Sequence, residues 1–126
     1  MNKLYDINNM TAQEVFDASV EHIYEQGVQS VDCEGQCNYR TASGLMCAAG
    51  IFIPEEKYEE SFEGQSWLQV AESFGSDGSH ALLVVALQRA HDFDLKCGWL
   101  AWEREITKIA AEHKLTFNKD RSGRTE

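Results

Sequence analysis

Five glutamates close together in the chain are the most concentrated chemical feature of this sequence. Glu55, Glu56, Glu59, Glu60 and Glu63 fall within one short stretch that follows a proline. In a helix, this spacing aligns them along one broad face. Like charges at i, i+4 destabilise a helix by a few tenths of a kcal/mol each, so a partner with a basic surface would relieve the repulsion. We therefore predict an acidic docking face; the alternative is a solvated face whose charges are screened beyond about 8 Å at physiological salt.

The four cysteines raise the question of a metal. Four thiols are the number that a structural zinc site needs, and Cys33, Cys37 and Cys47 would be its local ligands, with Cys97 far along the chain. None of the pairs has the two-residue separation typical of a zinc knuckle. Without an export signal we expect reduced thiols, and we predict neither a metal nor a cofactor.

Catalytic motifs are weak. His91 and Asp92 could form an acid–base pair, but neighbouring residues of a helix point about 100° apart. The stretch 64–68 lacks the second glycine of a nucleophile elbow. The loop 75–79 could present amides to an anion, but it has no lysine and carries Asp77. The sequence therefore predicts no catalytic residue, and a small enzyme of unknown class is only the third functional hypothesis.

A second class of function needs convergent aromatic and basic side chains. Tyr39, Arg40, Arg89 and Trp99 are the candidates, and Arg40 is the only base between residues 4 and 56. Arg40 either neutralises a neighbouring carboxylate or binds an anion with its planar guanidinium. Such a pocket would sequester a small nucleotide-like ligand, although the acidic charge of the chain opposes a phosphorylated one.

Charge is distributed unevenly along the 126 residues. Residues 1–78 carry fourteen acids and three bases, a net charge of −11, while residues 79–126 carry seven acids and eight bases, a net charge of +1. An acidic surface repels nucleic acid and anionic membranes and attracts basic partners. The longest apolar run, 81–87, is far shorter than the roughly 20 residues of a membrane span. Residues 1–10 lack the apolar core of a secretion signal, so we predict a cytoplasmic protein.

The N-terminal half begins with a clear helix signal. Thr11 and Glu14 form a capping box, and apolar residues at helical spacing predict a helix over 12–26 that ends at Gly27. The periodicity changes over residues 28–47, where turn residues separate short alternating segments. We predict a short β-hairpin or meander there.

The C-terminal half predicts more helices. Ser66 can cap one helix, a nearly all-apolar helix runs from Ala81 to about His91, and a last helix covers 99–113. The sequence thus predicts a mainly α, single-domain fold of four to five helices over residues 1–117, with a β insert at about 28–47. Residues 118–126 are predicted to form a flexible polar tail.

Part of this pattern resembles a known family. The sequence contains Cys37-x-Tyr39-Arg40, then Gly44-Leu45-x-Cys47-Ala48-x-Gly50, then Ile53-Pro54-x-x-x-Tyr58. With the upstream Thr-Ala-Gln-Glu-x-Phe, it resembles a family of small hypothetical proteins of tailed phages and prophages, over roughly residues 10–117. The resemblance implies a protein expressed during infection that adjusts host metabolism or defence, and it implies no catalytic residue.

Together these observations predict a non-enzymatic, phage-type accessory protein. In this hypothesis it binds and modulates a host protein through the acidic helical face, for host takeover or anti-defence, without binding nucleic acid or membrane. The second hypothesis is the nucleotide-like ligand sponge. Some of the apolar helical surface of the protein could equally serve a homodimer.

Overall fold

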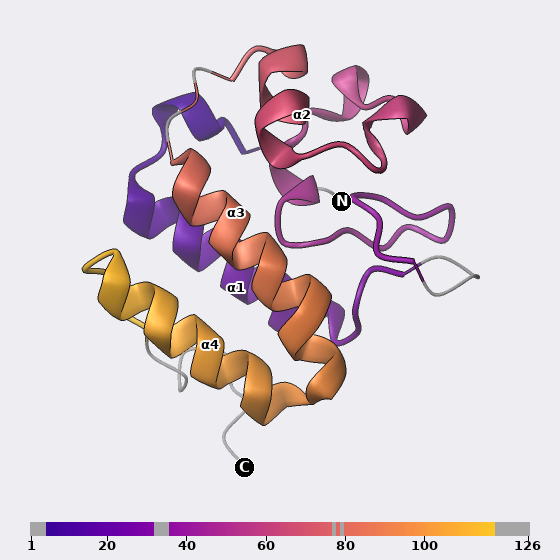
Figure 1. Cartoon of the computed structure of the whole chain (residues 1–126). Helices are drawn as coiled ribbons and strands as arrows, with labels where there is room; N and C mark the ends of the chain where they lie inside the picture. Colours follow the sequence, from indigo (N-terminus) through magenta and orange to yellow (C-terminus); the bar gives the residue numbers. More distant parts are fainter. Residues whose placement is uncertain (1–4, 32–35, 77, 79, 118–126) are drawn as a thin grey trace.

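Three helices form the main body of the molecule. The computed structural model describes residues 5–31, 36–76, 78 and 80–117. Helix α3 (Ala81–Arg89) contacts both α1 (Ala12–Gln26) and α4 (Trp99–Glu112), and α4 runs back along α3 in the opposite direction (Figure 1). The shorter helix α2 (Trp67–Phe74) packs against α3. The predicted mainly helical fold is confirmed.

Local signals set the ends of α1. The Thr11 hydroxyl accepts a hydrogen bond from the Glu14 amide at 3.1 Å, and the Glu14 carboxylate accepts one from the Thr11 amide at 2.8 Å. Gly27 ends the helix in a left-handed conformation with φ +78°, which glycine adopts without steric cost. The predicted helix over 12–26 is therefore confirmed at both ends.

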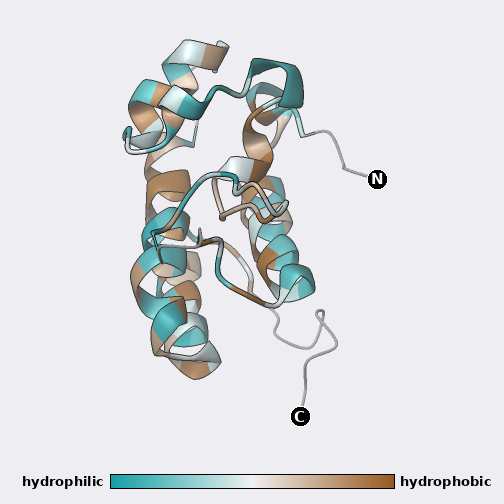
Figure 2. Ribbon diagram, turned by 90° about the vertical axis from the view of Figure 1, so that its right-hand side faces the viewer, coloured by the Kyte–Doolittle hydropathy of each residue, from teal (hydrophilic) through white to brown (hydrophobic). Residues whose placement is uncertain are grey.

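The core is formed where the three helices meet. Figure 2 shows hydrophobic and hydrophilic residues alternating along the helices, as expected for helices buried on one side. Each large apolar side chain that is buried contributes roughly 1.5–3 kcal/mol. The largest buried side chains of this body are Val15, Phe16, Ile23, Leu83, Leu87, Trp102, Ile106 and Ile109.

The segment between α1 and α2 contains no extended sheet among its described residues. Two isolated antiparallel bridges, Val31–Cys37 and Arg40–Met46, are its only β pairing there, so the predicted β-hairpin or meander is not supported. Side-chain hydrogen bonds add to the few backbone hydrogen bonds of this segment. The Gln26 side-chain carbonyl accepts from the Met46 amide at 2.9 Å.

The acidic stretch does not form the predicted helix. It forms two separate 3-10 turns, η3 (Glu55–Lys57) and η4 (Glu60–Phe62), with extended backbone at Tyr58 and Glu59. Phe62 is buried and packs edge-on against Tyr58. This anchor, together with like-charge repulsion between successive turns, favours the broken path. The prediction of one continuous glutamate face is therefore wrong.

Helix α3 ends in an unusual turn. It continues into a π-helical turn, η5 (Ala90–Asp94), in which the Leu95 amide donates to the Ala90 carbonyl. A 3-10 turn, η6 (Leu95–Cys97), then leads through Gly98 into α4. Single π turns are frequent at functional sites.

The sequence also predicts that the chain does not span a membrane and that it ends in a flexible tail. Among the described residues, no helix has the length and apolarity to span a bilayer. The predicted flexible tail, residues 118–126, lies outside the described residues.

Candidate functional site

Glu63 organises the segment between α1 and α2. Its carboxylate accepts hydrogen bonds from the backbone amides of Tyr39 at 2.8 Å and Arg40 at 3.1 Å. The Tyr58 hydroxyl donates to the same group at 2.6 Å. Hydrogen bonds to a charged acceptor are stronger than neutral ones, so this predicted member of the acidic face is instead a structural anchor.

Arg40 belongs to the same structural unit. One of its terminal nitrogens donates to the Ile53 carbonyl at 2.6 Å, and its guanidinium lies over the Tyr58 ring, 5.1 Å from the centroid. Burial and the adjacent Glu63 carboxylate raise the pKa of Tyr58 above its usual value. Arg40 therefore holds the loop together.

Gly50 and Cys47 complete this unit by close packing. A Cβ atom at Gly50 would lie 2.1 Å from the Tyr39 carbonyl oxygen, so only glycine fits. The Cys47 thiol is fully buried and accepts from the Gly50 amide at 3.2 Å. Burial raises the pKa of Cys47 to about 12, which makes it an unreactive thiol. The glycine and the cysteine that the sequence motif has at positions 50 and 47 are thus explained by close packing.

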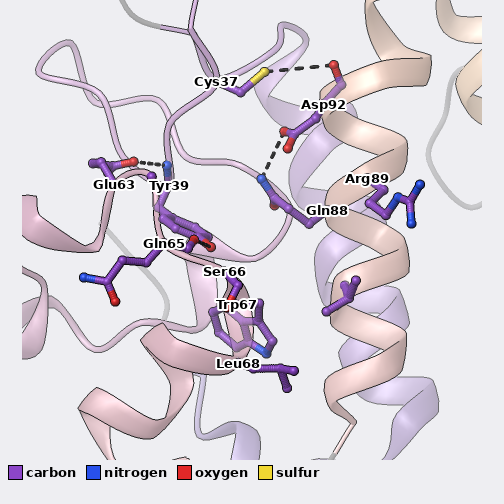
Figure 3. Close-up of a pocket in the computed structure, with 12 residues that line it drawn as sticks. Cys37, Tyr39, Glu63, Gln65, Ser66, Trp67, Leu68, Gln88, Arg89 and Asp92 are labelled. Carbon is purple, nitrogen blue, oxygen red and sulfur yellow. Dashed lines mark hydrogen bonds between the residues drawn. The ribbon is translucent and has the colours of Figure 1, made fainter.

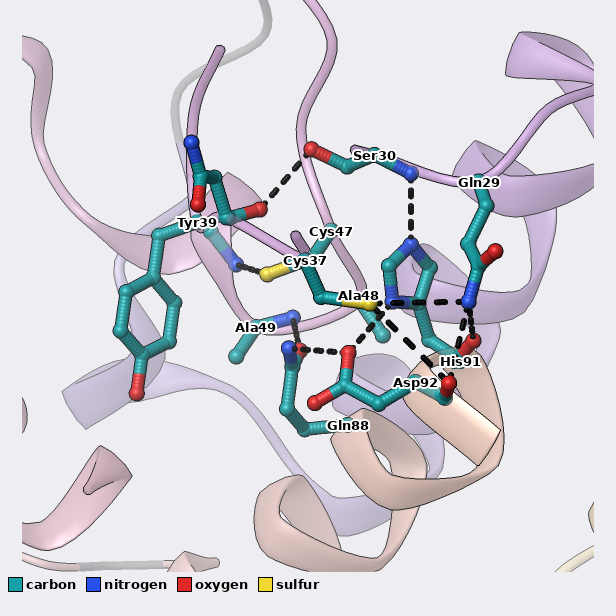
Figure 4. A network of polar contacts seen from close by, with 12 residues as sticks. Gln29, Ser30, Cys37, Tyr39, Cys47, Ala48, Ala49, Gln88, His91 and Asp92 are labelled. Atoms are coloured by element: carbon teal, nitrogen blue, oxygen red, sulfur yellow. Dashed lines mark hydrogen bonds and ion pairs between the residues drawn. The ribbon is translucent and has the colours of Figure 1, made fainter. Parts of the chain in front are cut away.

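A polar network joins this unit to the π turn (Figure 4). The Ser30 amide donates to Nε2 of His91 at 2.9 Å, and Nδ1 of His91 lies 2.8 Å from Oδ1 of Asp92. His91 is fully buried, while the Asp92 side chain is 25% exposed. The Gln88 amide nitrogen donates to the same Asp92 oxygen at 3.0 Å.

Gln29 and Cys37 close the other side of the network. The Gln29 side-chain nitrogen donates to the carbonyls of His91 at 2.8 Å and Asp92 at 3.1 Å, and it lies 3.6 Å from the Cys37 sulfur. Gln29 thus binds carbonyl groups of the π turn. Potential ligand atoms of Cys37, His91 and Asp92 lie within 4.8 Å of one another, which makes this the cluster to examine for metal or nucleophilic chemistry.

The hydrogen bonds of His91 argue against both metal binding and nucleophilic chemistry at this cluster. A backbone amide can only donate, so Nε2 must accept and carries no proton. The neutral ring then has its proton on Nδ1, which donates to Asp92. No lone pair is left for a metal, nor for taking a proton from the Cys37 thiol. His91 in this arrangement is a neutral structural link between residue 30 and the π turn.

Next to this network lies a pocket of about 430 Å³. We call it the α2–α3 pocket. One wall is the chain that leads into α2, the other is the exposed side of α3 and the π turn, and Cys37 lies at one end (Figure 3). Its lining residues are Cys37, Tyr39, Glu63, Gly64, Gln65, Ser66, Trp67, Leu68, Val85, Gln88, Arg89 and Asp92.

The pocket has a polar end and an apolar end. Gln88 and the Asp92 carboxylate lie near Cys37, while Trp67 and Leu68 lie at the opposite end (Figure 3). Burial, with the neighbouring thiol of Cys47 and acidic groups, raises the pKa of Tyr39 above its usual value. Its hydroxyl donates to the Gln65 carbonyl at 2.7 Å, so Tyr39 is a neutral wall residue.

The structure disperses the residues predicted for ligand binding. Tyr39 and Arg89 line the α2–α3 pocket, whereas Arg40 is held in the loop. Trp99 stacks on Tyr24 with ring centroids 5.5 Å apart and nearly parallel planes. The four side chains therefore do not converge on one site.

The predicted metal and docking residues are also separated. Cys33 lies outside the described residues, Cys37 lines the pocket and Cys47 is buried in the loop core. The acidic docking residues divide in two groups. Glu63 points into the loop, and the exposed members are Glu55, Glu56, Glu59 and Glu60.

Sequence reasoning missed Gln88, Asp92 and Trp67 as pocket residues. Gln88 and Asp92 are four residues apart, the spacing that places side chains on one helix face, and this signal was available. The contact between His91 and Asp92 lies in the π turn, whereas ideal α-helix geometry points neighbouring side chains about 100° apart. Trp67 lines the pocket although it is only 4% exposed.

Comparisons with known proteins assign neither a family nor a function to this chain. No protein-family model matches the chain, and neither the curated proteins nor the solved structures contain a match.

Proposed function

We propose that this protein is a non-enzymatic binding protein that holds a small ligand in the α2–α3 pocket. The observation that carries the proposal is the pocket itself, whose walls come from three separate segments of the chain. Ligand sites are typically concave, largely apolar and provided with a few convergent polar groups. Trp67, Leu68 and Val85 supply the apolar surface, and Gln88 and Asp92 supply the polar groups.

A binding role is favoured over catalysis because the nearest candidate catalytic group is already engaged. His91 has no free nitrogen in its present contacts, so it cannot take a proton from the nearby Cys37 thiol. The resemblance to phage and prophage proteins supports an infected host cell as the place where the protein acts. There the protein would act in the cytoplasm of an infected host, as an accessory protein of host takeover or anti-defence.

Native mass spectrometry of the gently purified protein tests the proposal. Val85→Trp places a bulky ring in the pocket, and Val28→Trp makes the same change at an exposed valine outside it. We expect a bound small molecule in the wild type and in Val28→Trp but not in Val85→Trp. Equal occupancy in all three proteins would contradict the assignment of the pocket.

A second candidate function is docking on a protein with a basic surface. It is favoured by the exposed carboxylates of Glu55, Glu56, Glu59 and Glu60, which surround a single base, Lys57. Electrostatic attraction of this kind speeds association and weakens as salt increases. Changing Glu56, Glu59 and Glu60 to lysine would abolish partner binding if this surface is the docking site, whereas Val85→Trp would not affect it.

A further inference from the structure

The polar end of the α2–α3 pocket has an unbalanced negative charge. Two carboxylates line the pocket, those of Glu63 and Asp92, against one base, Arg89. Arg89 is exposed, and its guanidinium points away from Trp67 and Leu68 (Figure 3). The base therefore lies at the rim.

The two carboxylates differ in what they can still bind. Glu63 already accepts from two amides and a hydroxyl. Asp92 uses only Oδ1, which accepts from Gln88 and His91. Within the described part of the chain, its second oxygen, Oδ2, accepts no hydrogen bond, and Asp92 forms no ion pair with Arg89. The oxygen open to a ligand is thus Oδ2 of Asp92.

The rest of the pocket favours an apolar body next to this oxygen. Leu68 is 58% exposed although it lines a pocket, so a ligand there would cover apolar surface that now faces water. Val85 faces the same space from α3. A ligand that reaches from Leu68 to Asp92 needs an apolar part and a hydrogen-bond donor at one end.

We propose that the ligand of the α2–α3 pocket is an organic cation, an ammonium or guanidinium group on an apolar stem, bound through Oδ2 of Asp92. This inference rests on the proposed ligand-binding function and names the ligand class. It disfavours the nucleotide-like ligand considered from the sequence, because a phosphate at the polar end would meet the carboxylates of Asp92 and Glu63. The cation could be a free amine or the side chain of a basic residue in a partner protein.

Matched probes on the wild-type protein test the charge preference without any mutation. Phenethylamine and 3-phenylpropionate have similar apolar bodies and opposite charges, and both are titrated while the Leu68 and Val85 methyl signals are followed by NMR. We expect the amine to bind and the carboxylate to bind at least tenfold more weakly. Equal binding, or tighter binding of 3-phenylpropionate, would overturn the cation inference and leave the proposed pocket intact.

Two asparagine variants then locate the charge. Asp92→Asn keeps Oδ1 as an acceptor for His91 and Gln88 and replaces Oδ2 by a donor. Losing one hydrogen bond between charged groups weakens phenethylamine binding about 10- to 100-fold. Asp94→Asn makes the same change in the same π turn outside the pocket, and we expect unchanged affinity. A similar loss in both variants would show that net charge, not Asp92, attracts the amine.

The source of the cation is resolved with a blocked amino acid. Nα-acetyl-arginine amide presents the guanidinium as a protein chain would. Binding of this probe at the Leu68 and Val85 methyls, lost in Asp92→Asn, would indicate a partner side chain, and binding of phenethylamine alone would indicate a free amine. If neither amine, carboxylate nor blocked arginine shifts these methyls and Val85→Trp changes no occupancy, the ligand-binding function itself fails.

Discussion

Replacing Glu63 by glutamine is the sharpest test of the structural role assigned to this residue. The glutamine side chain has the same shape but only one carbonyl oxygen. If that oxygen occupies the Oε2 position, it can still accept from the Arg40 amide and the Tyr58 hydroxyl. The Tyr39 amide, which now donates to Oε1 at 2.8 Å, would then face an NH₂ group.

The expected loss of stability follows from these contacts. One hydrogen bond to a charged acceptor is lost, at about 1.5–3 kcal/mol, and the other two become neutral and weaker. Partial exposure of Glu63 reduces the sum, so we expect Glu63→Gln to lower the free energy of unfolding by about 2–3 kcal/mol. For a domain of this size, Tm falls by roughly 4 °C per kcal/mol.

The assay is urea unfolding followed by circular dichroism, with Glu60→Gln as the matched control. Glu60 is exposed, and surface substitutions of this kind change stability by no more than about 0.5 kcal/mol. A second variant, Tyr58→Phe, forms a double-mutant cycle that isolates the hydroxyl contact. If Glu63→Gln were as stable as Glu60→Gln, Glu63 would be an ordinary surface carboxylate and not a structural anchor.

Three further outcomes are expected. Gly50→Ala should destabilise the fold by about 2–4 kcal/mol or prevent folding, because its Cβ would lie 2.1 Å from the Tyr39 carbonyl oxygen. Chemical denaturation measures the free energy of unfolding, and a decrease of less than about 0.5 kcal/mol would contradict this close packing. Burial lowers the pKa of His22 below its usual 6.5, so the unfolded chain binds more protons just below pH 6.5 and the free energy of unfolding falls as pH decreases there. Unfolding curves of His22→Gln should show a shallower decrease over that range, and an identical slope would refute the assignment. Iodoacetamide should modify the exposed Cys97 in the native protein and spare the buried Cys47, whose pKa is about 12; peptide mapping gives the sites, and equal labelling of both thiols would show that the loop opens.

The sequence alone determined the parts of this protein that depend on neighbouring residues. The capping box at Thr11 and the glycine after Gln26 defined α1, because both act within one helical turn. Ser66 defined the start of α2 for the same reason, its hydroxyl accepting from the Gln69 amide. Composition likewise established the acidic charge, which no fold can alter.

The functional candidates depended on distant contacts, and there the sequence was insufficient. The glutamate spacing predicted one helical face. Glu63 instead accepts hydrogen bonds from backbone amides 24 and 23 positions earlier in the chain. The residues next to Glu63 give no indication of such a distant contact. The β prediction is not supported either: the described residues form two isolated bridges, and α1 side chains bond to the Met46 and Ala48 backbone groups nearby.

The α2–α3 pocket is the clearest product of the tertiary structure. Ser30 and His91 are 61 positions apart, and only their contact shows that the histidine is neutral and has no free nitrogen. Asp92 lies in the π turn, where Oδ1 accepts from Gln88 and His91 and Oδ2 stays open. Helical periodicity could place Gln88 and Asp92 on one face, but the wall opposite them, from Tyr39 to Leu68, is brought there by packing energies summed over the whole chain.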